Sequence, residues 1–128
     1  MTRPFVLIVD DDEVIRSLLR LTLPTEGFDV LEAKDGKDAL SLVDGNAPAL
    51  VVLDWRMPGL SGEQVLTELK RRHPETPIIV LTAEPESASR KQAVSLGADV
   101  FVSKPFSPLQ LLATIERLLP ERALDERA

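Results

Sequence analysis

The feature that most constrains this chain is an unbroken apolar run from Ala49 to Leu53 that stops at a carboxylate, Asp54. Five apolar residues without alternation predict a strand that is buried on both faces of a sheet. Pro58 and Gly59 follow closely and predict a turn after the strand. We therefore expect Asp54 to lie at the carboxyl end of a central strand, where ligands can reach it. Taken alone, Asp54 could equally be the first polar residue of an ordinary loop.

Four further segments predict strands of the same sheet. Residues 5–9 and 77–81 are almost entirely apolar, residues 28–33 partly alternate, and residues 100–102 form a short apolar strand. Between the strands, apolar side chains recur at helical spacing, which predicts five helices. Their apolar positions are Val14, Ile15, Leu18 and Leu19 in the first; Ala39, Leu40 and Val43 in the second; Val65, Leu66 and Leu69 in the third, which Ser61 caps; few in the fourth, where Pro85 stands in the first turn; and Leu109, Leu112, Ile115 and Leu119 in the last.

Apolar strands that alternate with helices predict an α/β fold, a single doubly wound parallel sheet of five strands with helices on both faces. The partly alternating strand at residues 28–33 should lie at an edge. Together with right-handed crossovers, this favours the strand order 2-1-3-4-5, the flavodoxin-like winding. We expect one domain over residues 1–120, followed by a charged tail or linker stub over residues 121–128.

The composition limits the classes of function. The 128 residues include no cysteine, which excludes a disulfide framework and a thiolate metal site. The net charge of −6 argues against broad nucleic-acid binding. No apolar run reaches membrane-spanning length, and the chain does not start like a signal peptide. We therefore expect a cytoplasmic domain that binds neither nucleic acid nor membrane directly. His73, the sole histidine, lies at a basic helix end and is a poor candidate for a metal ligand.

Residues with obvious chemistry follow four of the five predicted strands: Asp10 and Asp11, Asp54, Thr82, and Lys104. In such sheets, ligands bind beyond the carboxyl ends of the strands. Each residue has an ordinary structural explanation, but all four explanations holding at one edge is much less probable. Clustered carboxylates repel one another unless a cation joins them, and oxygen ligands select a hard ion, Mg²⁺ or in its place Mn²⁺. A carboxylate, a hydroxyl, an ammonium and this ion suit in-line phosphoryl transfer, with Asp54 as nucleophile forming an acyl phosphate.

At these motifs the chain resembles the receiver domain of two-component response regulators, including the chemotaxis regulators. The resemblance runs from about Pro4 to Leu119, and its order and spacing are specific. It rests on Val9-Asp10-Asp11, Asp54-Trp55-Arg56-Met57-Pro58-Gly59, Leu81-Thr82-Ala83 and Lys104-Pro105-Phe106. It implies that a sensor histidine kinase or a phosphotransfer protein donates a phosphoryl group to Asp54, and that a downstream effector domain or protein reads the result. Such a domain is a signalling phosphoacceptor that catalyses its own phosphorylation and dephosphorylation, as a monomer or weak dimer.

The resemblance also assigns roles to the site residues. It implies that Asp11 and Asp54 ligate Mg²⁺ directly, together with the backbone carbonyl of Arg56, and that Asp10 acts through water. Asp12 falls outside this set, and we interpret it as a helix-start residue.

The family's conformational switch carries over to Thr82 and Phe101. Thr82 would be drawn toward the phosphoryl group while the Phe101 ring turns inward. Many family members have tyrosine at that position, and phenylalanine keeps only the packing part of the switch. The resemblance further implies a cis peptide bond between Lys104 and Pro105.

The pocket rim is expected to include Arg56, Ala83 and Glu84. Arg56 lies two residues after Asp54, and Glu84 lies two residues after Thr82. We expect the Arg56 and Glu84 side chains to face each other across the mouth of the pocket.

Three other readings remain open at this point. The segment Asp10-Asp11-Asp12-Glu13-Val14 also fits the start of haloacid-dehalogenase-like phosphatases, with Asp10 as nucleophile, although Asp54 would then be unexplained. A receiver-like docking domain would not need the acidic and lysine residues, and a flavodoxin would not carry an acidic loop beside its flavin phosphate.

The output of the domain is also open. The DNA-binding branch that dimerises through its last elements usually has an acidic and a basic residue where this chain has Val100 and Thr114.

Overall fold

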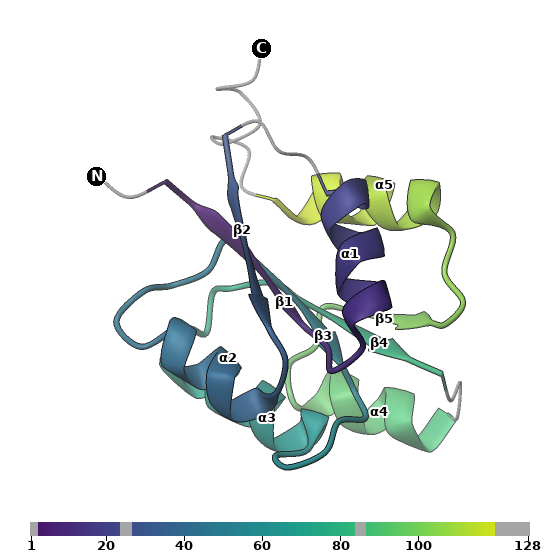
Figure 1. Ribbon diagram of the computed structural model, residues 1–128. Helices are drawn as coiled ribbons and strands as arrows, with labels where there is room; N and C mark the ends of the chain where they lie inside the picture. The colour runs from purple at the N-terminus through teal and green to yellow at the C-terminus, as the bar shows by residue number, and fades with distance from the viewer. Residues whose placement is uncertain (1–2, 24–26, 84–86, 120–128) are drawn as a thin grey trace.

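The computed structural model describes residues 3–23, 27–83 and 87–119. Strands and helices alternate along the chain as the sequence predicts (Figure 1). In chain order the elements are β1 (Phe5–Val9), α1 (Glu13–Thr22), β2 (Asp29–Ala33), α2 (Gly36–Leu42), β3 (Leu50–Asp54), α3 (Gly62–Arg72), β4 (Ile78–Thr82), α4 (Ser87–Ser95), β5 (Val100–Ser103) and α5 (Pro108–Leu118).

The five strands form one parallel sheet in the order β2-β1-β3-β4-β5, which confirms the predicted winding. The register places Val9 beside Leu53, Asp54 beside Leu81, and Thr82 beside Ser103. The carboxyl ends of β1, β3, β4 and β5 therefore lie side by side at one edge of the sheet. The residues that follow these strands are brought together there.

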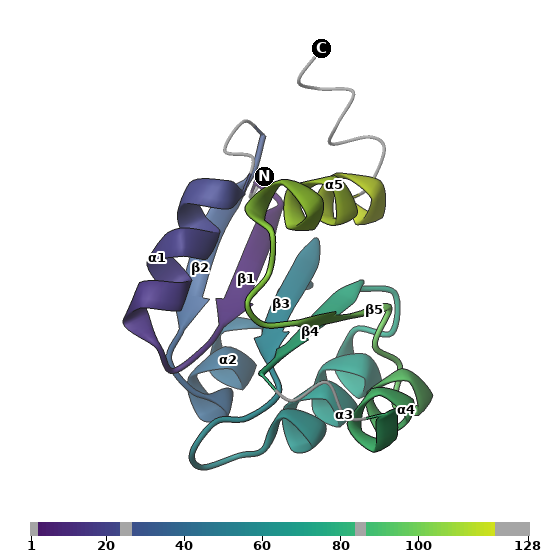
Figure 2. The ribbon, with the colours of Figure 1, turned by 90° about the vertical axis from the view of Figure 1, so that its right-hand side faces the viewer.

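Each face of the sheet has its own hydrophobic core, which explains why the central strands are apolar throughout. Alternate residues of a strand point to opposite faces. Ile8 and Val52 face a core with α1 and α5, whereas Val9 and Leu53 face a core with α2, α3 and α4. Figure 2 shows α1 and α5 on one face and the other three helices on the opposite face. A polar residue at any of these strand positions would be buried without compensation.

Polar side chains begin the helices as the sequence predicts. Asp12 caps α1 and accepts a hydrogen bond from the backbone N–H of Val14. Ser61 caps α3 and forms a capping box with Gln64, in which each side chain bonds the other residue's backbone N–H. Such caps typically contribute about 1 kcal/mol each. The Asp12 cap fixes where α1 begins, directly after the two acidic residues that follow β1.

Two helix faces differ from the prediction. In α1 the buried residue is Leu19, while Val14 is 73% exposed and Leu21 85% exposed. In α5 the core residues include Leu111 and Ile115, while Leu109 is exposed. Both helices carry apolar side chains on two faces, and spacing alone does not say which face meets the sheet.

The predicted first-turn residue Pro85 and the tail at residues 121–128 lie outside the described residues. Among those described, no helix has the length and apolarity needed to cross a membrane.

Candidate functional site

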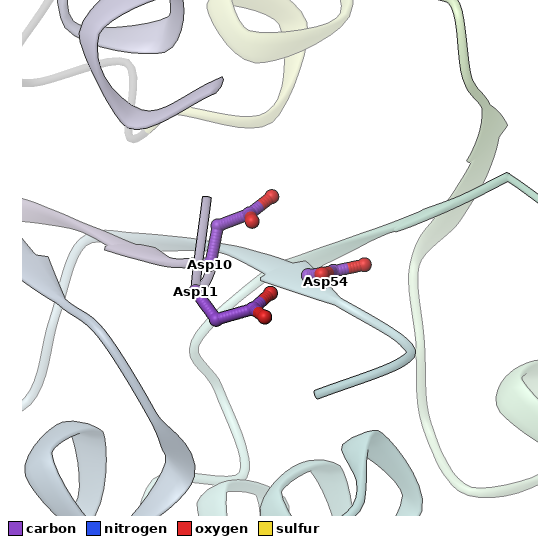
Figure 3. Close-up of side chains that lie close together, drawn as sticks. All are labelled: Asp10, Asp11 and Asp54. Atoms are coloured by element: carbon purple, nitrogen blue, oxygen red, sulfur yellow. The ribbon is translucent and has the colours of Figure 1, made fainter. Parts of the chain in front are cut away.

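Three carboxylates meet beyond the ends of β1 and β3. Asp10 and Asp11 directly follow β1, and Asp54 is the last residue of β3. Carboxylate oxygens of the three residues all lie within 4.8 Å of one another. Figure 3 shows the three side chains gathered at this edge of the sheet. The predicted acidic cluster is therefore present, built by adjacent parallel strands.

Two of the three carboxylates are buried, and their burial affects the charge of the cluster. Asp10 is 1% exposed and Asp54 5% exposed, whereas Asp11 is open to solvent. Burial, and next to it repulsion from Asp10, raises the pKa of Asp54 to about 6, against the attraction of a nearby ammonium. The structure thus holds Asp54 where a positive charge would stabilise its ionised form.

Lys104 supplies one such charge from the segment between β5 and α5. Its Nζ lies 3.2 Å from Oδ2 of Asp10 and 3.3 Å from Oδ1 of Asp54. Partial burial opposes the charged ammonium, but Asp54 and Asp10 outweigh it and raise the pKa of Lys104. The Lys104–Pro105 peptide bond is cis, in agreement with the prediction from the resemblance.

Thr82 and Phe101 lie on the neighbouring strands. Thr82, the last residue of β4, is fully buried, and Ala83 after it is exposed. The backbone N–H of Lys104 donates to the carbonyl of Thr82 over 2.7 Å, which ties the ends of the two strands together. Phe101 is 8% exposed, and the Arg90 guanidinium lies 5.1 Å from the centroid of its ring. Stacking of Arg90, from α4, was not predicted.

The chain turns sharply after Asp54. The backbone N–H of Arg56 points to Oδ1 of Asp54 over 3.4 Å, and the Arg56 residue is exposed. The Trp55 carbonyl accepts from the N–H of Gly62 at the start of α3. A Cβ at Gly62 would lie 2.5 Å from the Trp55 carbonyl oxygen, so only glycine fits there. The expected rim residue Glu84 lies outside the described residues, and its predicted pairing with Arg56 stays a prediction.

The donor set suits a hard divalent cation. Every candidate ligand is oxygen. Among the described residues, a single ammonium pairs with this cluster and contacts two of its three carboxylates, those of Asp10 and Asp54, which leaves negative charge to be offset. Asp11 is exposed, so the cluster is open on one side. These residues fit Mg²⁺ or Mn²⁺.

Sequence reasoning missed two residues next to this cluster. Arg16, on the first turn of α1, donates from Nη1 to the carbonyl of Asp10 over 2.8 Å and from Nε to Glu32 over 3.1 Å. The signal in the sequence is weak, because an arginine on an outer helix turn and a glutamate on an edge strand are common surface residues. Only the β1–β2 register shows that Glu32 lies beside Ile8, near the end of β1.

A family model described as the response regulator receiver domain matches residues 6–116. Among curated relatives, the transcriptional regulatory protein SrrA of Staphylococcus aureus is 42% identical over 114 residues. That match covers 89% of this chain and 47% of SrrA, so the chain spans about half the length of the curated relatives it matches.

Solved structures agree with this match. The chemotaxis protein CheY4 of Vibrio cholerae is 31% identical, with a TM-score of 0.83, over 92% of this chain and all of that one (100%). The beryllofluoride-activated receiver domain of DrrB is 32% identical, also with a TM-score of 0.83, over 91% of this chain and 97% of that one.

Proposed function

Because the chain belongs to the family of response regulator receiver domains of two-component systems, we propose that Asp54 is its phosphoacceptor. The observation that carries the proposal is the convergence of Asp10, Asp11, Asp54 and Lys104 at one edge of the sheet. A buried carboxylate at a strand end is held rigidly, which favours reaction in one geometry. Residues 1–120 would form this domain, with residues 121–128 as a tail or linker stub.

In the proposed reaction, an oxygen of the ionised Asp54 carboxylate attacks the phosphorus of a phosphodonor. The new P–O bond forms as the bond to the leaving group breaks, and the leaving group departs with that electron pair. Asp11, Asp54 and the Arg56 backbone carbonyl would hold Mg²⁺, with Asp10 acting through water. When bound, this ion offsets the negative charge of the phosphoryl oxygens. The Lys104 ammonium, now beside Asp54, would contact a further phosphoryl oxygen.

The same residues would return the domain to its resting state and transmit the signal. Water would attack the acyl phosphate and release inorganic phosphate, so the domain catalyses both its phosphorylation and its dephosphorylation. The hydroxyl of Thr82 would donate to a phosphoryl oxygen. Movement at Thr82 would be coupled to movement of the Phe101 ring, which lies on β5, two strands away from the Asp54 strand. Support comes from their places on β4 and β5, next to one another in the sheet.

The proposed partners are a histidine kinase or phosphotransfer protein as donor and an effector domain or protein as output, all in the cytoplasm. SrrA is a transcriptional regulatory protein, and this chain covers less than half of it, which supports an effector beyond the matched region. The exposed apolar residues Val14, Leu18 and Leu21 of α1 begin beside the site and offer a surface for the donor protein. Leu21→Arg should then slow transfer from a kinase that phosphorylates this chain, but not from acetyl phosphate.

The alternative of a haloacid-dehalogenase-like phosphatase is not supported, because the family match is to receiver domains. The structure also gives a physical reason. Both carboxylate oxygens of Asp10 are engaged, Oδ1 by the N–H of Asp12 and Oδ2 by Lys104. With both oxygens engaged, Asp10 is poorly placed to act as a nucleophile.

Chemical trapping tests the assignment of the phosphorylated residue. The protein is incubated with acetyl phosphate and Mg²⁺, and the acyl phosphate is reduced with borohydride, which converts a phosphorylated aspartate to homoserine. Peptide mass spectrometry should find homoserine at position 54. Homoserine at position 10 would overturn the proposal in favour of the phosphatase-like nucleophile.

A further inference from the structure

The backbone peptide that links Asp10 to Asp11 is held from outside the acidic cluster. Its carbonyl oxygen, that of Asp10, accepts a hydrogen bond of 2.8 Å from Nη1 of Arg16. The N–H of Asp10, which belongs to the preceding peptide, donates to the carbonyl of Ala33 in β2 over 3.1 Å. Rotation of the Asp10–Asp11 peptide would break the Arg16 contact and displace the Asp11 carboxylate.

The position of the Asp11 carboxylate depends on this backbone more than the positions of the Asp10 and Asp54 carboxylates do. The Asp10 carboxylate is fixed by the N–H of Asp12 and by Lys104. The Asp54 carboxylate contacts Lys104 and the N–H of Arg56. Within the described ranges, no side chain or backbone N–H donates to the Asp11 carboxylate. Its position is therefore set by the peptide that precedes it.

Arg16 is itself held in place by β2. Its Nε donates to Oε1 of Glu32 over 3.1 Å, while Arg20, one turn further along α1, donates to Oε2 over 2.7 Å. The Arg16 side chain is only 17% exposed, so its guanidinium has few alternative positions. The hydrogen bond from Arg20, with the charges of both arginines, lowers the pKa of Glu32 and keeps it ionised. Glu32 thus anchors Arg16, and Arg16 reaches back to the Asp10 carbonyl.

We propose that Arg16, anchored by Glu32, is a positioning residue that holds the Asp10–Asp11 peptide in the orientation required for cation binding at the acidic cluster. This inference rests on the proposed function, since it concerns the same site. Groups that orient metal ligands from outside the coordination shell commonly change metal affinity by about 10- to 100-fold. Arg16 would act through the backbone of Asp10 and touch neither the cation nor the phosphoryl group.

Arg20 provides a matched control. It carries the same charge, lies on the same helix and pairs with the same glutamate, but its other contact is the carbonyl of Val30. The loss of a positive charge near three carboxylates should by itself favour a cation. Positioning and simple electrostatics therefore predict opposite changes for Arg16→Ala.

The test is calorimetric titration of the full 128-residue chain with Mg²⁺ alone, for the wild type, Arg16→Ala and Arg20→Ala. We expect Arg16→Ala to weaken Mg²⁺ binding by about 10-fold and Arg20→Ala to change it by less than about 2-fold. Thermal unfolding without Mg²⁺ checks that both variants fold. If Arg16→Ala does not fold, Arg16→Gln, which keeps one donor but cannot bridge Glu32 and Asp10, replaces it with the same expectation.

A second readout separates positioning from general damage to the fold. In phosphorylation by acetyl phosphate, the Mg²⁺ concentration for half-maximal rate should rise in Arg16→Ala, while the rate at saturating Mg²⁺ stays near that of the wild type. Unchanged or tighter Mg²⁺ binding in Arg16→Ala, or equal weakening in Arg20→Ala, would overturn the inference. A wild-type protein that binds no Mg²⁺ would instead remove the metal site of the proposed function.

Discussion

The Nζ of Lys104 lies 3.3 Å from Oδ1 of Asp54, so an ion pair joins the ends of β5 and β3 across the intervening strand β4. Among the described residues, Lys104 is the one cation paired with the acidic cluster. It occupies the side of Asp54 where, in our proposal, it later contacts the phosphoryl group. In this proposal, the same ammonium stabilises the resting protein and then contacts the phosphoryl group on Asp54.

Lys104→Ala should destabilise the Mg²⁺-free protein, because two buried carboxylates lose their cation. Removal of one partner from a buried ion pair typically costs about 3 kcal/mol or more. Urea unfolding near neutral pH measures the loss. Lys34→Ala is the control, since Lys34 is exposed and follows β2 at the same edge, and it should change stability by less than about 0.5 kcal/mol. Mg²⁺ binding should persist in Lys104→Ala, and equal stability of the two variants would count against the role of the ion pair.

Asp54 should make the stability of the Mg²⁺-free protein depend on pH. Burial and Asp10 raise the pKa of Asp54 from 3.8 to about 6. A group with a raised folded pKa contributes stability that is complete below its unfolded pKa and is lost as the pH rises through the folded value. The loss, between about pH 4 and pH 6, amounts to roughly 3 kcal/mol.

Unfolding free energies of the wild type and Asp54→Asn, measured with chelator across this range, isolate that contribution. The pKa of Glu32 is lowered, so Glu32 makes the protein more stable as the pH rises. This contribution is common to both proteins and cancels in the difference between them. Asp54→Asn should become the more stable protein above about pH 6. Parallel pH profiles for the two proteins would show that the Asp54 carboxyl is not perturbed.

Trp55 should report on the occupancy of the site. It is the sole tryptophan, is 8% exposed, and directly follows Asp54. Mg²⁺, and then beryllofluoride as a phosphoryl mimic, should change its fluorescence, because charge near the indole changes. In Asp54→Asn the beryllofluoride response should disappear. The prediction would be refuted if the fluorescence stayed unchanged during a titration in which calorimetry shows binding.

Arg56 should set the lifetime of the acyl phosphate. If it forms a lid over the phosphoryl group with Glu84, Arg56→Ala and Glu84→Ala should each speed dephosphorylation, and the double variant should be little faster than either. An exposed pair of this kind adds only about 0 to 1 kcal/mol to stability, so the effect would be kinetic. Phosphate release from the four proteins at fixed Mg²⁺ decides. Slower or unchanged release from Arg56→Ala would show that the guanidinium stabilises the transition state or has no part in it.

The sheet and the acidic cluster could be predicted because they depend on features that the sequence displays directly. The central strands are unbroken apolar runs, and each ends at a residue with strong chemistry, such as Asp10 or Asp54. Once the strands are parallel, their carboxyl ends must meet. The position of Lys104 follows from the same rule, and the structure brings it to both aspartates.

The helix faces and the Arg16–Glu32 contact could not be predicted in this way. In α1, Val14 and Leu18 have the same spacing as Ile15 and Leu19, and the sequence does not say which pair meets the sheet. The contact between Arg16 and Glu32 depends on the rotation of α1 about its axis and on the register of β2 against β1. Both are set by packing of the whole domain rather than by any local pattern.

The central claim is that Asp54 alone accepts the phosphoryl group, and intact-mass spectrometry tests it most directly. The wild type, Asp54→Asn and the control Asp44→Asn, whose aspartate is exposed between α2 and β3, are incubated with acetyl phosphate and Mg²⁺. We predict that the wild type and Asp44→Asn each gain the mass of one phosphoryl group, and that Asp54→Asn, folded by circular dichroism, gains none. Full labelling of Asp54→Asn would contradict the account.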